Sequence, residues 1–168
     1  MYNAKDIALW FLYKNNAEIK EHIADNDDYE VYEGISHLKL QKLLYYAQGV
    51  YLSLNSGERL FEDKIMAWEH GPVVEPVYSI YKSNGRKTID FESTLENDEI
   101  IRVIESDSNA SNILNLVYDN FAIYTAWQLR DMTHEIGSPW DITVKNDGIN
   151  SEIKIELIKS YFDKHVME

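Results

Sequence analysis

The sequence predicts a mainly α-helical protein that folds as one compact domain of about six helices with a small two-stranded β-ribbon. Hydrophobic residues recur at helical spacing along most of the chain, whereas strand-like alternation is confined to two short segments, 64–69 and 87–91. The length of 168 residues suits one domain, and no repeat or Pro/Gly-rich linker divides residues 1–168. Because 45% of the residues are hydrophobic, the chain can form a substantial core.

Two long helices are expected in the N-terminal third. Asn3 is placed to cap the first helix, with Asp6 in its first turn, and helical spacing continues to about Ala24. Ser36 is placed to cap the second helix. Six hydrophobic residues within 40–54 lie on one face of this helix, which is typical of a helix that packs against a core.

The β-ribbon is expected to follow the second helix. Residues 64–69 alternate weakly and predict a short strand, and residues 87–91 predict the strand that pairs with it. Gly71 and Pro72 break the chain between them. Pro72 is expected to open a helix that runs to Tyr81, because the missing N–H of proline is not needed in a first helical turn.

The C-terminal half is expected to be helical. Thr125 and Gln128 form a capping-box pattern, which predicts the start of one helix. Gly137 and Pro139 are expected to stop that helix, because glycine closes a helix easily and proline cannot continue it. The helices expected in this half lie at residues 100–104, 113–121, 125–133 and 150–166, the last one capped by Asn150 or Ser151.

The charge of the chain argues against nucleic acid as a partner. Sixteen basic and 29 acidic residues give a net charge of −13 at pH 7. Diffuse binding to phosphates instead depends on lysine and arginine, which displace counterions. Residues 18–33 carry a net charge of −6 and residues 92–107 one of −5. We therefore expect two acidic insertions, at 18–33 and 92–107, in a scaffold that is otherwise nearly neutral.

Several classes of function are disfavoured by what the sequence lacks. Cysteine is absent, which rules out disulfides, thiol catalysis and thiolate metal sites. No phosphate-binding glycine loop, zinc-protease motif or glycine-flanked serine occurs, and the five histidines are not at metal-ligand spacing. We expect no metal, no cofactor and no enzymatic activity. Without a signal peptide or a membrane-length apolar segment, a cytoplasmic protein with no membrane contact is expected.

One alternative is a hydrolase that uses His134 with a distant carboxylate. The neighbouring Glu135 cannot be that carboxylate, because adjacent residues on a helix point about 100° apart. The simpler interpretation is that His134 packs at the C-terminal end of its helix, where a cation is favoured. His70 precedes the turn at Gly71 and is interpreted as a turn-stabilising or partner-facing residue.

Tyrosine and lysine residues suggest further interpretations. Tyr45 and Tyr46 flank the hydrophobic face of the second helix, so at least one of them is expected to lie at its edge or to face outward. A DNA-binding regulator is a second alternative. It would read DNA in a winged-helix-like manner with Lys39, Lys42, Arg86 and Lys87.

Three sequence motifs follow one another along the chain. They are LKLQKLLYYAQGVYL at 38–52, LFEDKIMAWEHGPVVEPVYSIY at 60–81 and LNLVYDNFAIYTAWQLRDMTHEIGSPW at 114–140. Together they resemble the Panacea domain of SocA-type antitoxins, also described as phage-associated GepA-like proteins, over residues 3–140. The resemblance implies a mostly helical, non-enzymatic domain that neutralises a cognate toxin by direct protein contact. In the SocA type, the resemblance further implies an adaptor that delivers the toxin to a protease.

A partner-binding surface is expected from the motif residues and from the acidic insertion, where neutralising the acids should weaken binding and leave thermal stability nearly unchanged. The alternative is that the motif residues only form the core and turns of the fold. A phage-encoded factor that acts on host proteins is a further alternative, and the oligomeric state is not predicted. The residues expected to contact the partner are Lys42, Tyr45, Tyr46, Trp68, His70, Gly71, Pro72, His134 and Trp140, together with Asp25, Asp27 and Asp28 of the acidic insertion.

Overall fold

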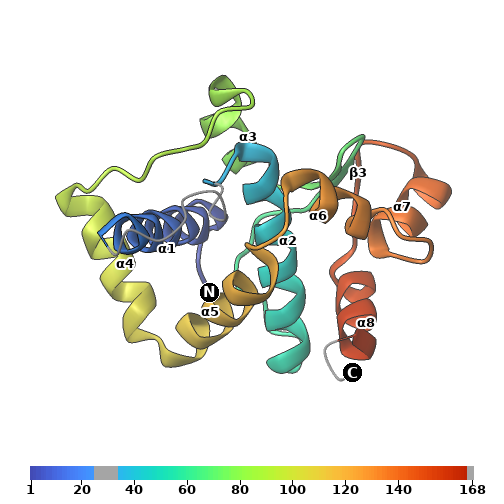
Figure 1. The fold of residues 1–168 in the computed structure, drawn as a ribbon. Coiled ribbons are helices and arrows are strands. Elements are labelled where there is room, and N and C mark those ends of the chain that lie inside the picture. Colours follow the sequence, from blue (N-terminus) through green and yellow to red (C-terminus); the bar gives the residue numbers. More distant parts are fainter. Residues whose placement is uncertain (25–33, 166–168) are drawn as a thin grey trace.

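A computed structural model describes residues 1–24 and 34–165, and within them the chain is mainly helical (Figure 1). This part of the chain forms eight α-helices, a short 3₁₀ helix and a three-stranded antiparallel sheet, where about six helices and two strands were predicted. In chain order the elements are α1 (Ala4–Ala24), α2 (His37–Leu54), β1 (Met66–Trp68), β2 (Gly71–Val73), α3 (Glu75–Tyr81), the 3₁₀ helix η2 (Lys82–Asn84), α4 (Leu95–Ser106), α5 (Ser108–Phe121), α6 (Ala126–Thr133), α7 (Pro139–Asp147), β3 (Ser151–Glu152) and α8 (Ile155–His165).

Helix α2 lies at the centre of the fold. It contacts α1, α3, α5, α6, α8 and strand β2 (Figure 1). Thirteen of its 18 residues are buried, and these include polar residues outside the hydrophobic face. The hydrophobic spacing predicted one packed face, whereas the structure covers α2 on nearly all sides. Its buried polar side chains therefore need partners inside the protein.

Two predicted helix caps are confirmed. The Ser36 hydroxyl accepts a hydrogen bond from the backbone N–H of Lys39 at the start of α2. At the start of α6, the Thr125 hydroxyl accepts from Gln128 N, and the Gln128 side chain accepts from Thr125 N. Both caps satisfy N–H groups that have no partner within their own helix. The starts of α2 and α6 are thus set by local sequence.

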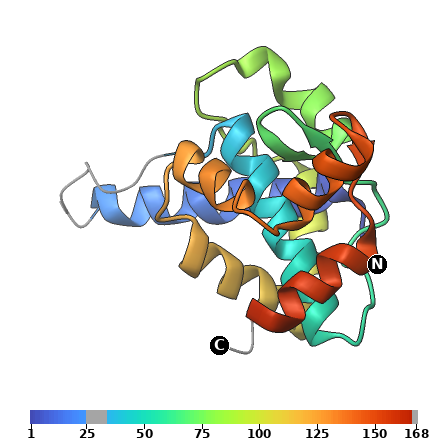
Figure 2. The same cartoon turned by 90° about the vertical axis from the view of Figure 1, so that its right-hand side faces the viewer.

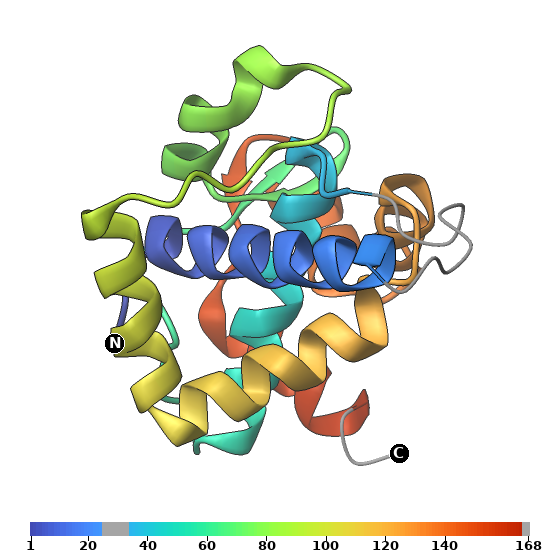
Figure 3. The same ribbon diagram turned by 60° about the vertical axis from the view of Figure 1, so that its left-hand side comes forward.

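The remaining helices surround α2 from two sides. Helices α1, α4 and α5 lie on one side, where α1 contacts α2 and α4, and α5 also contacts α2 and α4 (Figure 3). Helix α8 packs against α2 from the other side (Figure 2). The contact is close because Gly49 has no side chain. A Cβ at Gly49 would lie 2.2 Å from a ring carbon of Phe162, so α8 can dock only on a glycine here.

The sheet differs from the predicted ribbon. Strand β1 pairs antiparallel with both β2 and β3, so it is the central strand in the order β2-β1-β3, and Trp68 lies opposite Gly71. The predicted partner strand, 87–91, is not part of this sheet. Within it, Thr88 forms only an isolated bridge with Ser36. Strands β2 and β3 have three and two residues, which is too short for alternation to reveal them.

Three predicted helix boundaries are corrected. Pro72 lies in β2 and does not open a helix; Pro76 instead occupies the first turn of α3. Pro139 was predicted only to stop a helix, but it also opens α7, which Ser138 caps. Ser151 belongs to β3 and does not cap the last helix. In each case a residue that was predicted to begin or end one helix belongs to another helix or strand.

The predicted partner-binding residues Asp25, Asp27 and Asp28 lie outside the described residues, as does most of the acidic insertion at 18–33. The second acidic segment, 92–107, contains helix α4. This helix carries two acidic residues in its first turn, where the helix dipole favours negative charge. A search of the described helices for a membrane span found none with sufficient length and hydropathy.

Candidate functional site

Most of the predicted site residues meet at the β1–β2 hairpin and at the helix ends that pack on it. Trp68 pairs with Gly71, and Glu69 and His70 form the two-residue turn between them. Gly71 has a φ of +105°, which residues with side chains rarely adopt. A Cβ at Gly71 would also lie only 2.8 Å from the Nζ of Lys42. Glycine is therefore required here both for the backbone conformation and for space.

Lys42 is fully buried beneath this hairpin, which corrects the prediction that it lies at a binding surface. Its Nζ donates a hydrogen bond of 3.1 Å to the carbonyl oxygen of Pro72. Among the described residues, no carboxylate forms an ion pair with it. Burial, together with the smaller effect of the positive charge of Arg130, lowers the pKa of Lys42 to about 7. The side chain holds β2 onto α2 and does not contact solvent.

His134 ends α6 and holds the turn of the hairpin. Its Nδ1 lies 2.7 Å from Arg130 O, and its Nε2 lies 3.2 Å from Glu69 O. Its ring packs on Trp140, with centroids 3.7 Å apart, and Trp140 Nε1 donates a 2.8 Å hydrogen bond to Trp68 O. Burial lowers the pKa of His134. Both ring nitrogens face backbone carbonyls, and within the described residues no carboxylate is bonded to the ring, so the geometry does not support the hydrolase alternative.

The exposed edge of the hairpin site carries a small aromatic and basic surface. His70 packs edge-on against Trp127, with ring centroids 5.8 Å apart. The guanidinium of Arg130 lies 5.5 Å from the centre of the Trp127 ring, within the range of a cation–π contact. Trp127 is 56% exposed although it is a large aromatic residue. We call His70, Trp127 and Arg130 the hairpin rim.

Tyr45 and Tyr46 do not belong to the hairpin site. They lie on the part of α2 that faces α8, with ring centroids 5.5 and 5.9 Å from that of Phe162. Tyr45 is 2% and Tyr46 6% exposed, so neither faces outward; the alternative prediction, that one of them lies at the edge of the hydrophobic face, stays a prediction. The reason lies in the tertiary packing, because α8 covers this part of α2. The local sequence pattern of α2 does not indicate which helix will pack there.

The hydroxyl of Tyr45 is buried without a hydrogen-bond partner among the described residues. Because an unsatisfied buried polar group costs free energy, we expect Tyr45→Phe to raise the free energy of unfolding by about 1 kcal/mol. Tyr118→Phe is the matched control, because the Tyr118 hydroxyl accepts a 3.0 Å hydrogen bond from Asn15. That change should lower the free energy of unfolding instead. Urea denaturation of both variants measures this, and a loss of stability in Tyr45→Phe would contradict the assignment.

The basic patch proposed for DNA reading is not formed as predicted. Lys39 and Lys42 are both buried, and Lys39 Nζ donates a 2.6 Å hydrogen bond to Ala122 O. Of the four basic residues, only Arg86 and Lys87 are exposed. Two exposed cations on a chain with a net charge of −13 do not make the positively charged face that DNA recognition uses.

Sequence reasoning missed two buried glutamines on α2. Gln41 accepts a 2.7 Å hydrogen bond from Val74 N, just after β2. Gln48 accepts from Leu60 N at 2.9 Å and donates to Phe61 O at 2.9 Å. The two glutamines are seven residues apart on α2. Gln41 binds the backbone just after β2, and Gln48 binds the backbone at residues 60–61. The spacing of these two polar residues beside the hydrophobic face of α2 is the sequence signal that could have predicted their burial.

Taken together, the motif residues form a scaffold that fixes a hairpin on α2 and leaves His70 and Trp127 of the hairpin rim exposed, beside the half-buried Arg130 that pairs with Asp131 at 3.0 Å. No group of three or more His, Asp or Glu side chains among the described residues could hold a metal ion. The arrangement positions backbone groups and the exposed side chains of His70 and Trp127. Such a site is suited to binding.

Comparisons with known proteins agree with the motifs. A family model described as "Antitoxin SocA-like, Panacea domain" matches residues 40–141, which contain the hairpin site and its supporting helices. The chain is 33% identical over 121 residues to a protein named Antitoxin SocA from Caulobacter vibrioides, a match that covers 69% of this chain and 63% of that protein. No solved structure shows significant similarity to the chain.

Proposed function

Because the chain belongs to the SocA-like antitoxin family with a Panacea domain, we propose that it is the antitoxin of a toxin–antitoxin pair. It neutralises a cognate toxin in the cytoplasm by direct protein–protein binding, as a single domain over residues 1–168 and without enzymatic activity. The observation that carries this proposal is the hairpin site itself, in which the contacts of Lys42, Gly71 and His134 are internal and His70 and Trp127 face outward. The match spans less than two thirds of the SocA relative, and the proposed mode of action therefore rests on the residues of this chain.

The hairpin rim is the proposed contact surface. Tryptophan and arginine are frequent among the residues that dominate binding energy at protein interfaces. Trp127 and Arg130 are held by their mutual cation–π contact and by α6, so little conformational freedom would be lost on binding. Of the predicted contact residues at the hairpin, His70 is the exposed one, and Lys42, Gly71 and Pro72 act by supporting it.

We expect Trp127→Ala to weaken toxin neutralisation at least tenfold without lowering the melting temperature. The test co-expresses the product of the neighbouring gene with this protein at graded levels and measures growth. Leu95→Ala is the matched control, because Leu95 is 89% exposed but lies at the start of α4, away from the hairpin. The proposed function fails if the neighbouring product is harmless alone or stays toxic in the presence of the wild-type protein.

An adaptor role in proteolysis is the finer form of the proposal. If the protein delivers its toxin to a protease, the toxin should have a shorter half-life when this protein is present. Pulse-chase labelling of the toxin with and without the antitoxin distinguishes delivery from simple sequestration. A toxin half-life that is unchanged or longer would leave neutralisation by binding as the mechanism and remove the adaptor role.

A further inference from the structure

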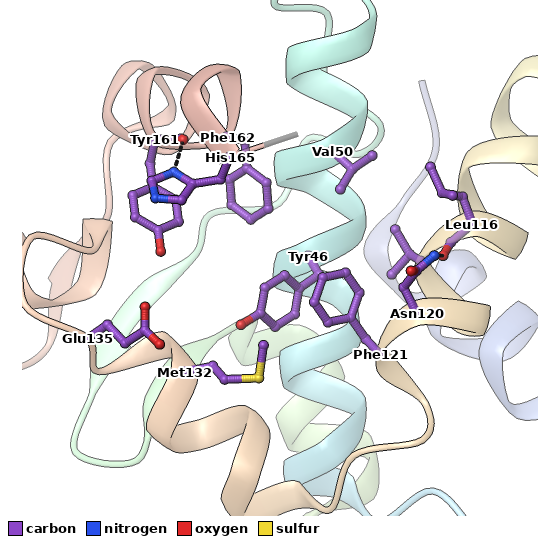
Figure 4. A pocket seen from close by; sticks show the side chains of 11 residues that line it. Tyr46, Val50, Leu116, Asn120, Phe121, Met132, Glu135, Tyr161, Phe162 and His165 are labelled. Atoms are coloured by element: carbon purple, nitrogen blue, oxygen red, sulfur yellow. Dashed lines mark hydrogen bonds between the residues drawn. The ribbon is translucent and has the colours of Figure 1, made fainter. Parts of the chain in front are cut away.

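A pocket of about 380 Å³ opens between α2, the end of α5, the end of α6 and α8, apart from the hairpin site (Figure 4). Its walls are mainly aromatic and aliphatic, and Asn120, Glu135 and His165 are the polar residues among those that line it. The carboxylate of Glu135 lies at its edge. The side chains that the argument uses are Tyr46, Phe121, Met132, Glu135, Tyr161 and Phe162.

The aromatic walls are fixed by packing within the protein. Tyr46 and Phe121 are stacked, with ring centroids 4.0 Å apart and an angle of 14° between their planes. Tyr161 and Phe162 meet edge to face at 5.6 Å. Aromatic rings that line a pocket can contact planar groups and attract cations.

Glu135 supplies a negative charge beside these walls. Figure 4 shows its carboxylate at the pocket, with the hydroxyl groups of Tyr46 and Tyr161 pointing toward it. Burial raises the pKa of both tyrosines, and the charge of Glu135 raises it further. Among the described residues, no hydrogen bond or ion pair ends on the Glu135 carboxylate, so its oxygens are available to a ligand.

We infer that this pocket binds an arginine side chain of a basic segment of the toxin, an inference that rests on the proposed function. A guanidinium group can pack against the partly exposed ring of Phe121 and form a bidentate hydrogen bond with the exposed carboxylate of Glu135. The net charge of −13 favours a basic partner over an acidic one. A purely apolar side chain would fill the same space but would bury Glu135 without a partner, which costs binding free energy.

The direct test uses short peptides and does not require the toxin. Met132 lines the pocket, so its ¹³C-labelled methyl group reports occupation by NMR, with a Met132→Leu variant to assign the signal. The probe is acetyl-Gly-Arg-Gly-amide, and the matched peptide replaces arginine by citrulline, which has the same shape without the charge. We expect a saturable shift with the arginine peptide and at least tenfold weaker binding of the citrulline peptide.

Two variants separate a local contact from general electrostatics. Glu135→Gln should weaken binding of the arginine peptide at least tenfold, whereas Glu96→Gln, which removes an equal charge from the exposed start of α4, should change it less than twofold. Equal binding of the arginine and citrulline peptides would overturn the inference. Tighter binding of acetyl-Gly-Phe-Gly-amide than of the arginine peptide would also overturn it, in favour of an apolar anchor.

The two proposals can fail separately. If the wild-type protein neutralises the neighbouring gene product but Glu135→Gln does so equally well, the toxin is bound without this pocket and the inference fails alone. If the neighbouring product is harmless, the proposed function fails, and with it the identity of the arginine donor. When both hold, Glu135→Gln should raise the antitoxin level needed for growth at least tenfold, and Glu96→Gln should leave it unchanged.

Discussion

Gly49→Ala is expected to lower the free energy of unfolding by about 1–2 kcal/mol. The added Cβ would lie 2.2 Å from Cε2 of Phe162, so α8 would have to move away from α2 or the ring would have to leave its position. Overpacking of a filled core costs about 1–3 kcal/mol. Alanine is favoured over glycine inside a helix by about 1 kcal/mol, which offsets only part of this cost. Urea denaturation measures the difference.

A double-mutant cycle tests whether Phe162 is the cause. Phe162→Leu alone should destabilise the protein, because it removes part of a buried aromatic ring. In the presence of Phe162→Leu, however, the alanine at position 49 should cost less, since Cε2 and Cζ, two of the three ring atoms it would strike, are gone. If the effects of Gly49→Ala and Phe162→Leu simply add, the contact between α2 and α8 does not explain the requirement for glycine.

The helices of this fold could be predicted because their signals are local. The caps at Ser36 and Thr125 act within one helical turn, and hydrophobic spacing marks the helices that they begin. The sheet could not be predicted in the same way. Strand β3 pairs with β1 across a large sequence separation, and its two residues show no periodicity of their own. Strand β3 forms only because the chain passes beside β1 after α7.

The residues that meet at the hairpin could be predicted only in part, and their exposure could not. The order of the motifs correctly grouped Trp68, His134 and Trp140, which meet through the hydrogen bond to Trp68 O and the packed rings. Residue type suggested that Lys42 and the tyrosines of α2 reach the surface, because lysine is rarely buried. Whether a side chain on a central helix is covered depends on its neighbours in space. The exposed Trp127 and the pocket at Glu135 emerge only from the folded chain.

The stability of the protein is expected to rise between pH 7 and pH 9 because of Lys42. In the folded protein its pKa is lowered to about 7 from an ordinary value of 10.5, chiefly by burial. Across this window the unfolded chain binds a proton that the folded protein has released, so raising the pH favours folding. One such proton gives a slope of up to about 1.4 kcal/mol per pH unit, or roughly 2 kcal/mol in total.

Lys42→Met should remove this rise, because methionine keeps an unbranched apolar side chain and cannot take up a proton. The variant should also be at least as stable as the wild type at pH 7, since it buries no ammonium group. Lys82→Met is the matched control, because Lys82 is exposed and its loss should leave the slope intact. Urea denaturation at pH 7, 8 and 9 stays below the range in which tyrosines of the unfolded chain ionise and favour unfolding. A wild-type protein of constant stability over this window, or a Lys42→Met variant that keeps the rise, would mean that Lys42 is not held as a buried, partly neutral amine beneath the hairpin.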